Sequence, residues 1–269
     1  MRKNEQVGGV RRFPPPQYGT TTPASKDPSL GPRGLGGTHP SRSLIARWMG
    51  KHEPAESPYG HASSTILSFM PLPARDAELV EIVNASLAEA ARRAGAFLAC
   101  RIGCTQCCHG AFAINALDAA RLRAGMNELR TTSPSLASEI ESRARAWLAE
   151  HGADFPGDRN TGILGESLQD QEKFADFANE AACPALDPAT GRCDVYTWRP
   201  MTCRVFGPPV RAIGDDGQEG LGHCELCFIG ATPEQVAACE MPVPHDLETE
   251  LLDEIAADFE TVVAFALLP

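Results

Sequence analysis

No apolar run in this sequence is long enough for a membrane span or an export signal. The stretch Ile66 to Met70 is far shorter than the ~20 apolar residues of a transmembrane helix. Arg11 and Arg12 resemble the start of a twin-arginine export signal, but Phe13 and three prolines follow where an apolar segment is needed. We therefore expect a cytoplasmic protein with no membrane partner.

The main part of the chain also lacks an excess of positive charge. The formal net charge is −11, and residues 1–69 hold nine Lys or Arg against four Asp or Glu. Residues 70–269 therefore carry about −16. Because neutralising phosphates requires clustered cations, we expect no nucleic-acid partner.

Familiar catalytic patterns are missing as well. There is no recognisable Ser, His and Asp arrangement and no pair of acids with a reason to be catalytic. The one glycine-rich run, Gly34 to Gly37, has no strand before it and no helix after it, as a nucleotide-binding loop would require. The sequence therefore leaves open whether the protein is an enzyme, and it names no substrate.

Two regions differ in composition. Residues 1–72 are crowded with Pro, Gly, Ser and Thr and show no apolar periodicity, which predicts a disordered segment. Residues 73–269 have helical periodicity and capping signals, which predict one folded domain. We expect one helix from Asp76, which can cap it, to about Ala99, a second from Asn115 to near Gly125, and further helices that begin near Ser133, Ser167 and Thr232. An amphipathic segment covers 246–268.

Cysteine is abundant, with ten in the chain, and four lie within positions 100–108. A packed core gains little from four thiols where Leu, Val or Ala would fill the same space. In a reducing cytoplasm, such a pattern indicates metal binding or catalysis in preference to disulfides. A shared soft cation is therefore the better explanation.

A straight helix through 100–108 cannot place these thiols on one ion. All four would face one way, but Cys100 and Cys108 would be about 12 Å apart along the axis. Sulfurs that share one Zn²⁺ lie within roughly 4 Å of each other. Either Gly103 breaks the backbone, or some ligands come from elsewhere in the chain.

A second cysteine block follows downstream. Cys183 and Cys193 flank the turn-forming residues 187–191, which predicts a short β-hairpin that brings the two thiols together. Cys203 lies between two arginines, and Cys224 and Cys227 form a CxxC knuckle. We expect Cys239, on a short helix, to be buried and inert.

The two blocks together resemble the YkgJ-type cysteine-cluster family, which carries a CxxCxxCC motif and a zinc- or iron-chelating domain. The resemblance covers about 100–230, although Cys100 and Cys104 are separated by three residues instead of two. It implies a metal-chelating module, sometimes labelled an iron-sulfur oxidoreductase, and flagellin lysine methylases resemble the family too. The residues that carry it are Cys100, Cys104, Cys107, Cys108, Cys183-Pro184, Cys193, Tyr196, Arg199-Pro200, Cys203-Arg204 and Phe206.

Ligation by cysteine alone admits zinc or an iron-sulfur cluster, and the residues do not separate the two. Arg199 and Arg204 could offset the negative charge of several thiolates. We expect Tyr196 to be a core residue, and His109 and His223 to be hydrogen-bonded or solvent-facing. The candidate metal ligands are Cys104, Cys107, Cys108, Cys183, Cys193 and Cys203 first, then Cys100, and then Cys224 and Cys227.

We therefore predict a mainly α domain around an irregular, cysteine-ligated metal core, with one short β-hairpin. Three functions stay open: a metal-chelating module that holds its own fold or hands ions to a protein partner, an iron-sulfur protein, and, more distantly, a radical S-adenosylmethionine or methylase-related enzyme. The last rests on the CxxxCxxC spacing of Cys100, Cys104 and Cys107. The oligomeric state is open.

Overall fold

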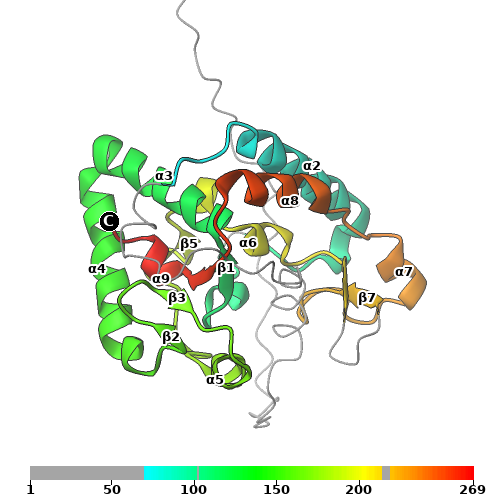
Figure 1. Cartoon of the computed structure of the whole chain (residues 1–269). Coiled ribbons are helices and arrows are strands. Elements are labelled where there is room, and N and C mark those ends of the chain that lie inside the picture. Colours follow the sequence, from blue (N-terminus) through cyan, green and yellow to red (C-terminus); the bar gives the residue numbers. More distant parts are fainter. Residues whose placement is uncertain (1–69, 102, 214–218) are drawn as a thin grey trace, which may run out of the picture. The chain divides into compact units, whose positions relative to one another are not determined.

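The computed structural model describes residues 70–101, 103–213 and 219–269, which all belong to one compact unit. Most of the predicted disordered segment, up to residue 69, lies outside the described residues. The helices are α2 (Asp76–Ala94), α3 (Ala116–Thr132), α4 (Pro134–His151), α5 (Leu168–Asp176), α6 (Met201–Val205), α7 (Pro233–Ala237), α8 (His245–Ile255) and α9 (Val263–Ala266) (Figure 1). The strands are β1 (Ala113–Asn115), β2 (Gly157–Asp158), β3 (Ile163–Leu164), β4 (Leu186–Asp187), β5 (Arg192–Cys193), β6 (Val210–Ile213), β7 (Glu219–Gly222) and β8 (Glu260–Val262).

Helix α3 lies at the centre of this unit. Its cap is the predicted one, because the Asn115 side chain accepts a hydrogen bond from the Asp118 amide. Leu117 packs with α2 and α8, whereas Met126 packs with α4 and α9. The prediction that this helix ends near Gly125 was wrong, because Gly125 leaves room for the Trp198 ring, which lies 2.3 Å from where a Cβ would be.

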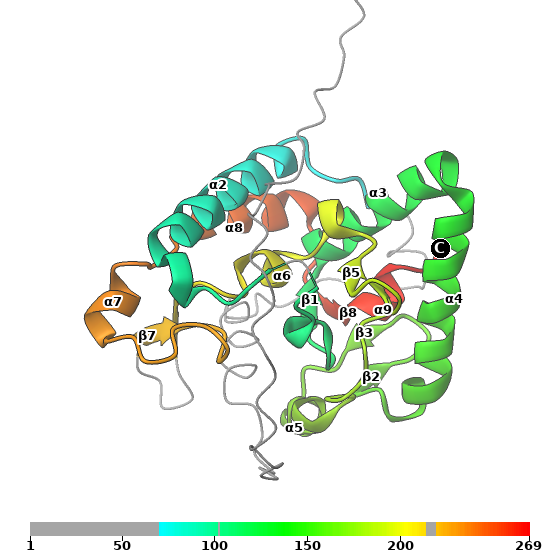
Figure 2. The ribbon, with the colours of Figure 1, turned by 180° about the vertical axis from the view of Figure 1, so that it is seen from behind.

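Helix α2 is shorter than predicted and begins differently. It ends at Ala94, and Gly95 then takes a φ of +51°, so that the chain enters a 3₁₀ turn (Gly95–Phe97) before Cys100. Asp76 was predicted to cap the helix, but its carboxylate is buried and accepts hydrogen bonds from Arg121. Helices α2 and α8 lie side by side (Figures 1 and 2).

The C-terminal segment is not one continuous amphipathic helix. Helix α8 ends at Ile255, where Ala256 adopts a left-handed conformation. The chain then forms β8, which pairs antiparallel with β1 in a register that puts Ala113 opposite Val262. Thr261 is fully buried, and its hydroxyl donates to the Gly162 carbonyl. Burial of this β-branched segment against β1 therefore replaces the expected helix.

The described residues form four two-stranded antiparallel pairs, where the sequence predicted one. The predicted hairpin is β4–β5, in which the Asp187 carboxylate accepts from the Ala189 amide and Gly191 has a φ of +67°. The other pairs are β1–β8, β2–β3 and β6–β7. Pairs as short as β2–β3 carry too few residues for a period of two to show in the sequence.

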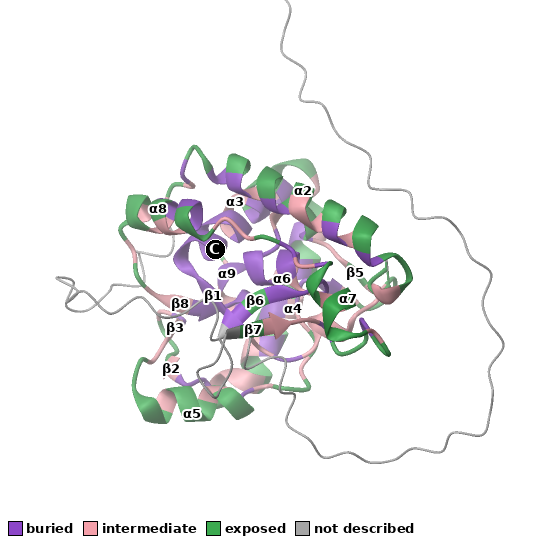
Figure 3. Cartoon of the chain, turned by 90° about the vertical axis from the view of Figure 1, so that its right-hand side faces the viewer, coloured by how far each residue is buried: buried purple, intermediate pink, exposed green. Residues whose placement is uncertain are grey.

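The buried residues gather between the helices, and the outer faces of α2, α5 and α7 are exposed (Figure 3). Helix α4 follows its predicted pattern, with Ile140, Ala144 and Trp147 turned inward. In the described part of the chain, no helix combines the length and apolar character that crossing a bilayer requires.

Candidate metal site

The chain around the first cysteine block is broken and does not continue α2. Gly103 has a φ of +87°, which supports the predicted break at this glycine. Two tight turns follow, closed by hydrogen bonds from the Cys104 amide to the Arg101 carbonyl and from the Cys108 amide to the Thr105 carbonyl. A 3₁₀ turn (Gln106–Cys108) then carries two of the thiols.

The two cysteine blocks meet through the backbone. The Cys183 amide donates to the Cys108 carbonyl at 2.7 Å, and the Gly110 amide donates to the Ala181 carbonyl at 2.7 Å. Between these bonds, His109 and Ala182 form an antiparallel bridge. Residues 108–110 therefore run beside 181–183, although more than seventy residues of chain separate them.

Four thiols from these blocks form one group, Cys107, Cys183, Cys193 and Cys203, which we call the four-thiol group. Burial raises the pKa of Cys203 well above its usual value, and the thiols of Cys107, Cys183 and Cys193 raise it further. Burial followed by the neighbouring Cys193 raises the pKa of Cys183 to about 12, and burial raises that of Cys193 to about 11. These thiols are thus near enough for each charge to affect its neighbours.

Three other thiols form a second group, Cys100, Cys224 and Cys227, which we call the three-thiol group. The sulfurs of Cys100 and Cys227 are 3.9 Å apart. Hydrogen bonds from Cys100 and then Cys224 lower the pKa of Cys227, so this sulfur holds the negative charge most readily. The two groups are neighbours, because Cys224 contributes to the raised pKa of Cys107 after the larger effects of Cys108 and burial.

Backbone amides donate hydrogen bonds to several of these sulfurs. Each bond lowers the pKa of its thiol, because an N–H group stabilises a negative sulfur. Since a neutral thiol is a weak acceptor, this arrangement is suited to thiolates, the form that binds metals. The donors are Ala185 and Leu186 for Cys183, Val195 for Cys193, Leu226 for Cys224, and Ala99 and Cys100 for Cys227.

Arg199 lies beside the four-thiol group. Its positive charge lowers the pKa of Cys193 and Cys203, although burial outweighs it at both thiols. The guanidinium lies 3.8 Å from the centre of the Tyr196 ring and donates to the Tyr196 carbonyl. The Tyr196 ring was predicted to be buried, but 59% of this residue is exposed.

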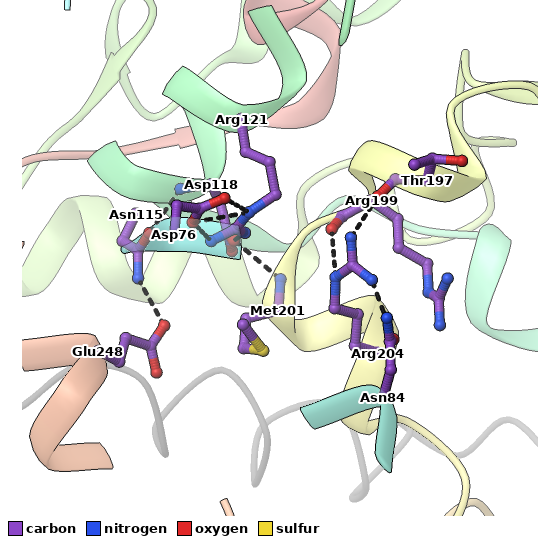
Figure 4. A network of polar contacts seen from close by, with 10 residues as sticks. All are labelled: Asp76, Asn84, Asn115, Asp118, Arg121, Thr197, Arg199, Met201, Arg204 and Glu248. Atoms are coloured by element: carbon purple, nitrogen blue, oxygen red, sulfur yellow. Dashed lines mark hydrogen bonds and ion pairs between the residues drawn. The ribbon is translucent and has the colours of Figure 1, made fainter. Parts of the chain in front are cut away.

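Arg204 has a different position from the one that the sequence indicated. Its guanidinium is buried and donates to the Thr197 and Arg199 carbonyls and to the Asn84 side chain (Figure 4). These bonds hold the segment between β5 and α6 in place. Arg204 therefore supports the backbone around Cys203, and the expected compensation of thiolate charge falls to Arg199 alone.

A buried ion-pair network was not predicted from the sequence. Arg121 on α3 pairs with both Asp76 and Asp118, and Asp118 also accepts from the Met201 amide at 2.8 Å (Figure 4). Met201 begins α6, the helix that carries Cys203. The one available signal was a charged pair three residues apart within an otherwise apolar stretch of α3.

Beside this network, Asn115 donates to the buried carboxyl group of Glu248. Burial, followed by the charge of Asp118, raises the pKa of Glu248 to about 7. Figure 4 shows Glu248 and Asn115 next to the ion pairs of Arg121.

His109 and His223 were predicted to be hydrogen-bonded or solvent-facing. The structure agrees, because the Nδ1 atom of each ring forms a hydrogen bond with the backbone. His109 bonds to the Thr105 carbonyl and His223 to the Cys224 carbonyl, each at 3.0 Å. Cys239 is buried in the apolar cluster that also holds Cys224 and Cys227. Cys104 and Cys108 are partly buried, and Cys108 is hydrogen-bonded to Cys107 of the four-thiol group.

The donor set suits a soft cation, since it consists of sulfur in a largely buried setting. As the side chains stand, no three Cys, His, Asp or Glu groups in the described ranges converge closely enough to hold an ion. Metal binding would therefore draw the thiolates together, and the amide donors and Arg199 would stabilise their charge.

Comparison with known proteins gives one match. Residues 99–215, a little under half of the chain, match the family model CxxCxxCC, described as "Putative zinc- or iron-chelating domain". No curated protein and no solved structure matches the chain. The matched segment contains the first cysteine block, the β4–β5 hairpin and Cys203, so the chain is similar to the CxxCxxCC family over these residues.

Proposed function

We propose that the four-thiol group binds one zinc or iron ion and that this ion holds the domain together. The observation that carries the proposal is the mutual proximity of Cys107, Cys183, Cys193 and Cys203, which come from three separate parts of the chain. Four protein sulfurs complete a tetrahedral site and leave no position for a substrate. Such closed sites are typical of structural ions, whose binding energy adds to the stability of the fold.

The segments that carry the four-thiol group have little regular structure of their own, so added stability from a bound ion would matter there. Residues 99–110 and 178–200 hold only 3₁₀ turns and two-residue strands, so their backbone is fixed by few regular hydrogen bonds. A metal ion would fix them more firmly than apolar contacts between short turns. This role supports a metal-chelating module over an enzyme that acts on a substrate at this site.

An iron-sulfur cluster is the second candidate for the same thiols. Cys108 follows Cys107 directly and is hydrogen-bonded to it, so more sulfur surrounds the site than one ion needs. A cluster tolerates wider spacing between its cysteines than a single ion does. Electron transfer would then be the function.

The structure does not favour a radical S-adenosylmethionine enzyme. That reading requires Cys100, Cys104 and Cys107 to serve one cluster, but Cys100 and Cys107 belong to different thiol groups. The described strands also form antiparallel pairs and not a series of βα units.

Elemental analysis of protein purified without oxygen from its native source tests the proposal. Colourless protein with stoichiometric zinc supports a single structural ion, whereas brown protein with acid-labile sulfide supports the cluster. The variant Cys203→Ser should lose the metal, whereas Cys239→Ser should keep it, because Cys239 is buried outside the four-thiol group. Unchanged metal content in Cys203→Ser would refute the assignment.

A further inference from the structure

Cys100 is the most accessible thiol of the chain. All ten cysteines lie among the described residues, and of these Cys100 alone is exposed. Residues 98–101, which carry it, belong to no helix or strand. A reagent dissolved in water therefore reaches Cys100 more readily than any other thiol of the protein.

A buried partner thiol lies close to Cys100. The sulfurs of Cys100 and Cys227 are 3.9 Å apart, although 127 residues separate them along the chain. Cys227 is only 1% exposed, so it is shielded from reagents in solution. A disulfide has a sulfur-to-sulfur distance of about 2.05 Å, so forming one here requires an approach of about 1.9 Å. A change of χ1 rotamer at Cys100 moves its sulfur farther than this.

The surroundings keep the two sulfurs close and leave Cys100 room to move. The Phe228 amide donates to the Phe97 carbonyl at 2.7 Å, which joins the segment before Cys100 to the residue after Cys227. The two phenyl rings stack with centroids 5.9 Å apart. A Cβ at position 207 would lie 3.0 Å from the Cys100 sulfur, so Gly207 keeps a side chain away from this thiol.

Cys224 is the third thiol at this place. It shares hydrogen bonds with both Cys100 and Cys227. However, Cys224 is only 2% exposed, so a disulfide between Cys224 and Cys227 would have to begin with an oxidant reaching a buried sulfur. The exposure of Cys100 therefore favours a bond between Cys100 and Cys227.

We propose that Cys100 is a modification site for small disulfides and that Cys227 resolves the modified form. The Cys100 sulfur attacks one sulfur of a low-molecular-weight disulfide, RSSR, which leaves a mixed disulfide on Cys100 and releases RSH. The Cys227 sulfur then attacks the Cys100 sulfur and displaces the second RSH. In total, two protein thiols and RSSR give one protein disulfide and two RSH, so two electrons and two protons pass from the protein to the reagent.

Such a bond responds to the redox state of the surrounding thiols. In a reducing compartment, disulfides of this kind are transient and serve sensing or catalysis. The bond would fix Cys100, at the start of the first cysteine block, to the CxxC knuckle. This inference goes beyond the proposed function, because neither Cys100 nor Cys227 belongs to the four-thiol group.

Oxidised glutathione, a small disulfide, tests the site on the full-length protein. After treatment in the absence of oxygen, the remaining thiols are alkylated and the protein is digested without reduction by trypsin and a glutamate-specific protease. Cleavage after Arg101 separates Cys100 from the other thiols of the first block. Cleavage after Glu225 separates Cys224 from Cys227.

Mass spectrometry of this digest should find two peptides joined through Cys100 and Cys227, and dithiothreitol should separate them. Absence of the joined peptides would overturn the proposal. A bond between Cys224 and Cys227 in their place would overturn it as well.

Serine variants separate the roles of the two thiols. Cys227→Ser should keep glutathione on Cys100 as a mixed disulfide, because the thiol that displaces it is gone. Cys100→Ser should leave Cys227 unmodified, and since residue 100 is exposed, this variant should fold. Cys239→Ser, in the same apolar cluster as Cys227, should form the bond as wild type does. Oxidation of Cys227 at the wild-type rate in Cys100→Ser would refute entry through Cys100.

The same variants keep this inference separate from the proposed function. Cys203→Ser should form the disulfide as wild type does, because Cys203 takes no part in it. If Cys203→Ser keeps its metal, the proposed function is wrong and the disulfide result stands. If Cys203→Ser loses its metal but glutathione produces no bond between Cys100 and Cys227, this inference is wrong and the four-thiol site stands.

Discussion

At the scale of single residues, the charge near each thiol determines how readily it gives up its proton. Arg199 is the cation beside the four-thiol group, and it lowers the pKa of Cys193 and Cys203. Metal ions compete with protons for these sulfurs. Arg199 should therefore contribute to metal affinity without touching the metal.

We expect Arg199→Ala to weaken metal binding roughly tenfold at neutral pH, in line with the effect of other groups that support metal ligands. Because the pKa values of Cys193 and Cys203 lie far above neutral pH and rise further without Arg199, the loss should be nearly the same at every pH in the neutral range. Competition with a chromogenic chelator at several pH values measures this. Arg145→Ala is the control, since Arg145 is exposed and pairs with Glu141 on α4. Equal affinity for wild type and Arg199→Ala at every pH would contradict the role.

Glu248 gives a pH-dependent prediction about stability. Its pKa of about 7 in the fold lies above its usual value of 4.5, so the folded state holds the proton more tightly than the unfolded state does. The contribution of Glu248 to the free energy of unfolding is therefore largest below pH 4.5. It is lost as the pH rises from 4.5 through 7. Burial is the largest cause.

Replacing Glu248 by Gln removes this titration and keeps an acceptor for Asn115. We expect Glu248→Gln to be more stable than wild type at pH 8, by up to about 3 kcal/mol, and to differ little at pH 4.5. Urea unfolding at the two pH values measures the difference. Glu254→Gln, an exposed position on the same helix, should show no such pH dependence. A pH-independent effect of Glu248→Gln would exclude a raised pKa.

At the scale of elements, the helix starts at Asn115, Ser167 and Thr232 were predicted correctly from local signals, whereas the cap at Asp76, the end of α3 and the pairing of β8 were not. The caps at Asn115 and Ser167 and the capping box at Thr232 form as predicted, because each depends on residues three positions apart. The end of α3 was missed because it depends on Trp198, more than sixty residues beyond. The pairing of β8 with β1 was missed for the same reason.

The contact between Gly125 and Trp198 predicts how α3 responds to substitution. Gly125→Ala gains up to about 1 kcal/mol of helix propensity, but the new methyl group must displace the Trp198 ring, which costs about 1 to 3 kcal/mol. We expect net destabilisation. Gly152→Ala is the matched control, because nothing lies within 4 Å of its Cβ position and its φ is −64°. Chemical denaturation compares the two, and a more stable Gly125→Ala would show that the ring moves freely.

At the scale of the whole molecule, the sequence predicted the cysteines as a set but not their division. The first rank of predicted ligands held Cys104 and Cys108 as well as the four thiols that meet. Which thiols meet depends on the breaks at Gly95 and Gly103 and on the pairing of 108–110 with 181–183. The ion-pair network around Arg121 could not be predicted from the sequence either, because its residues come from α2, α3 and the start of α6.

Removal of the metal should loosen the molecule unevenly. We expect residues 99–110 and 178–206 to exchange amide hydrogen faster after chelation, because their backbone is held by few regular hydrogen bonds. Helices α3 and α4 should keep most of their protection, because they pack on each other through fully buried residues such as Leu122, Met126 and Ile140, and only Cys183 and Cys193 of the four thiols pack against this core. Hydrogen exchange with and without chelator measures this. A uniform change over the whole domain would show that the metal controls global unfolding instead.

The contact between Cys100 and Cys227 also has a consequence during synthesis of the chain. At roughly 5 to 20 residues per second, the ribosome needs on the order of ten seconds to add the 127 residues between them. During that interval the first cysteine block has emerged but its partners do not yet exist. Until translation has passed Cys227, the thiol of Cys100 therefore has no partner from the CxxC knuckle.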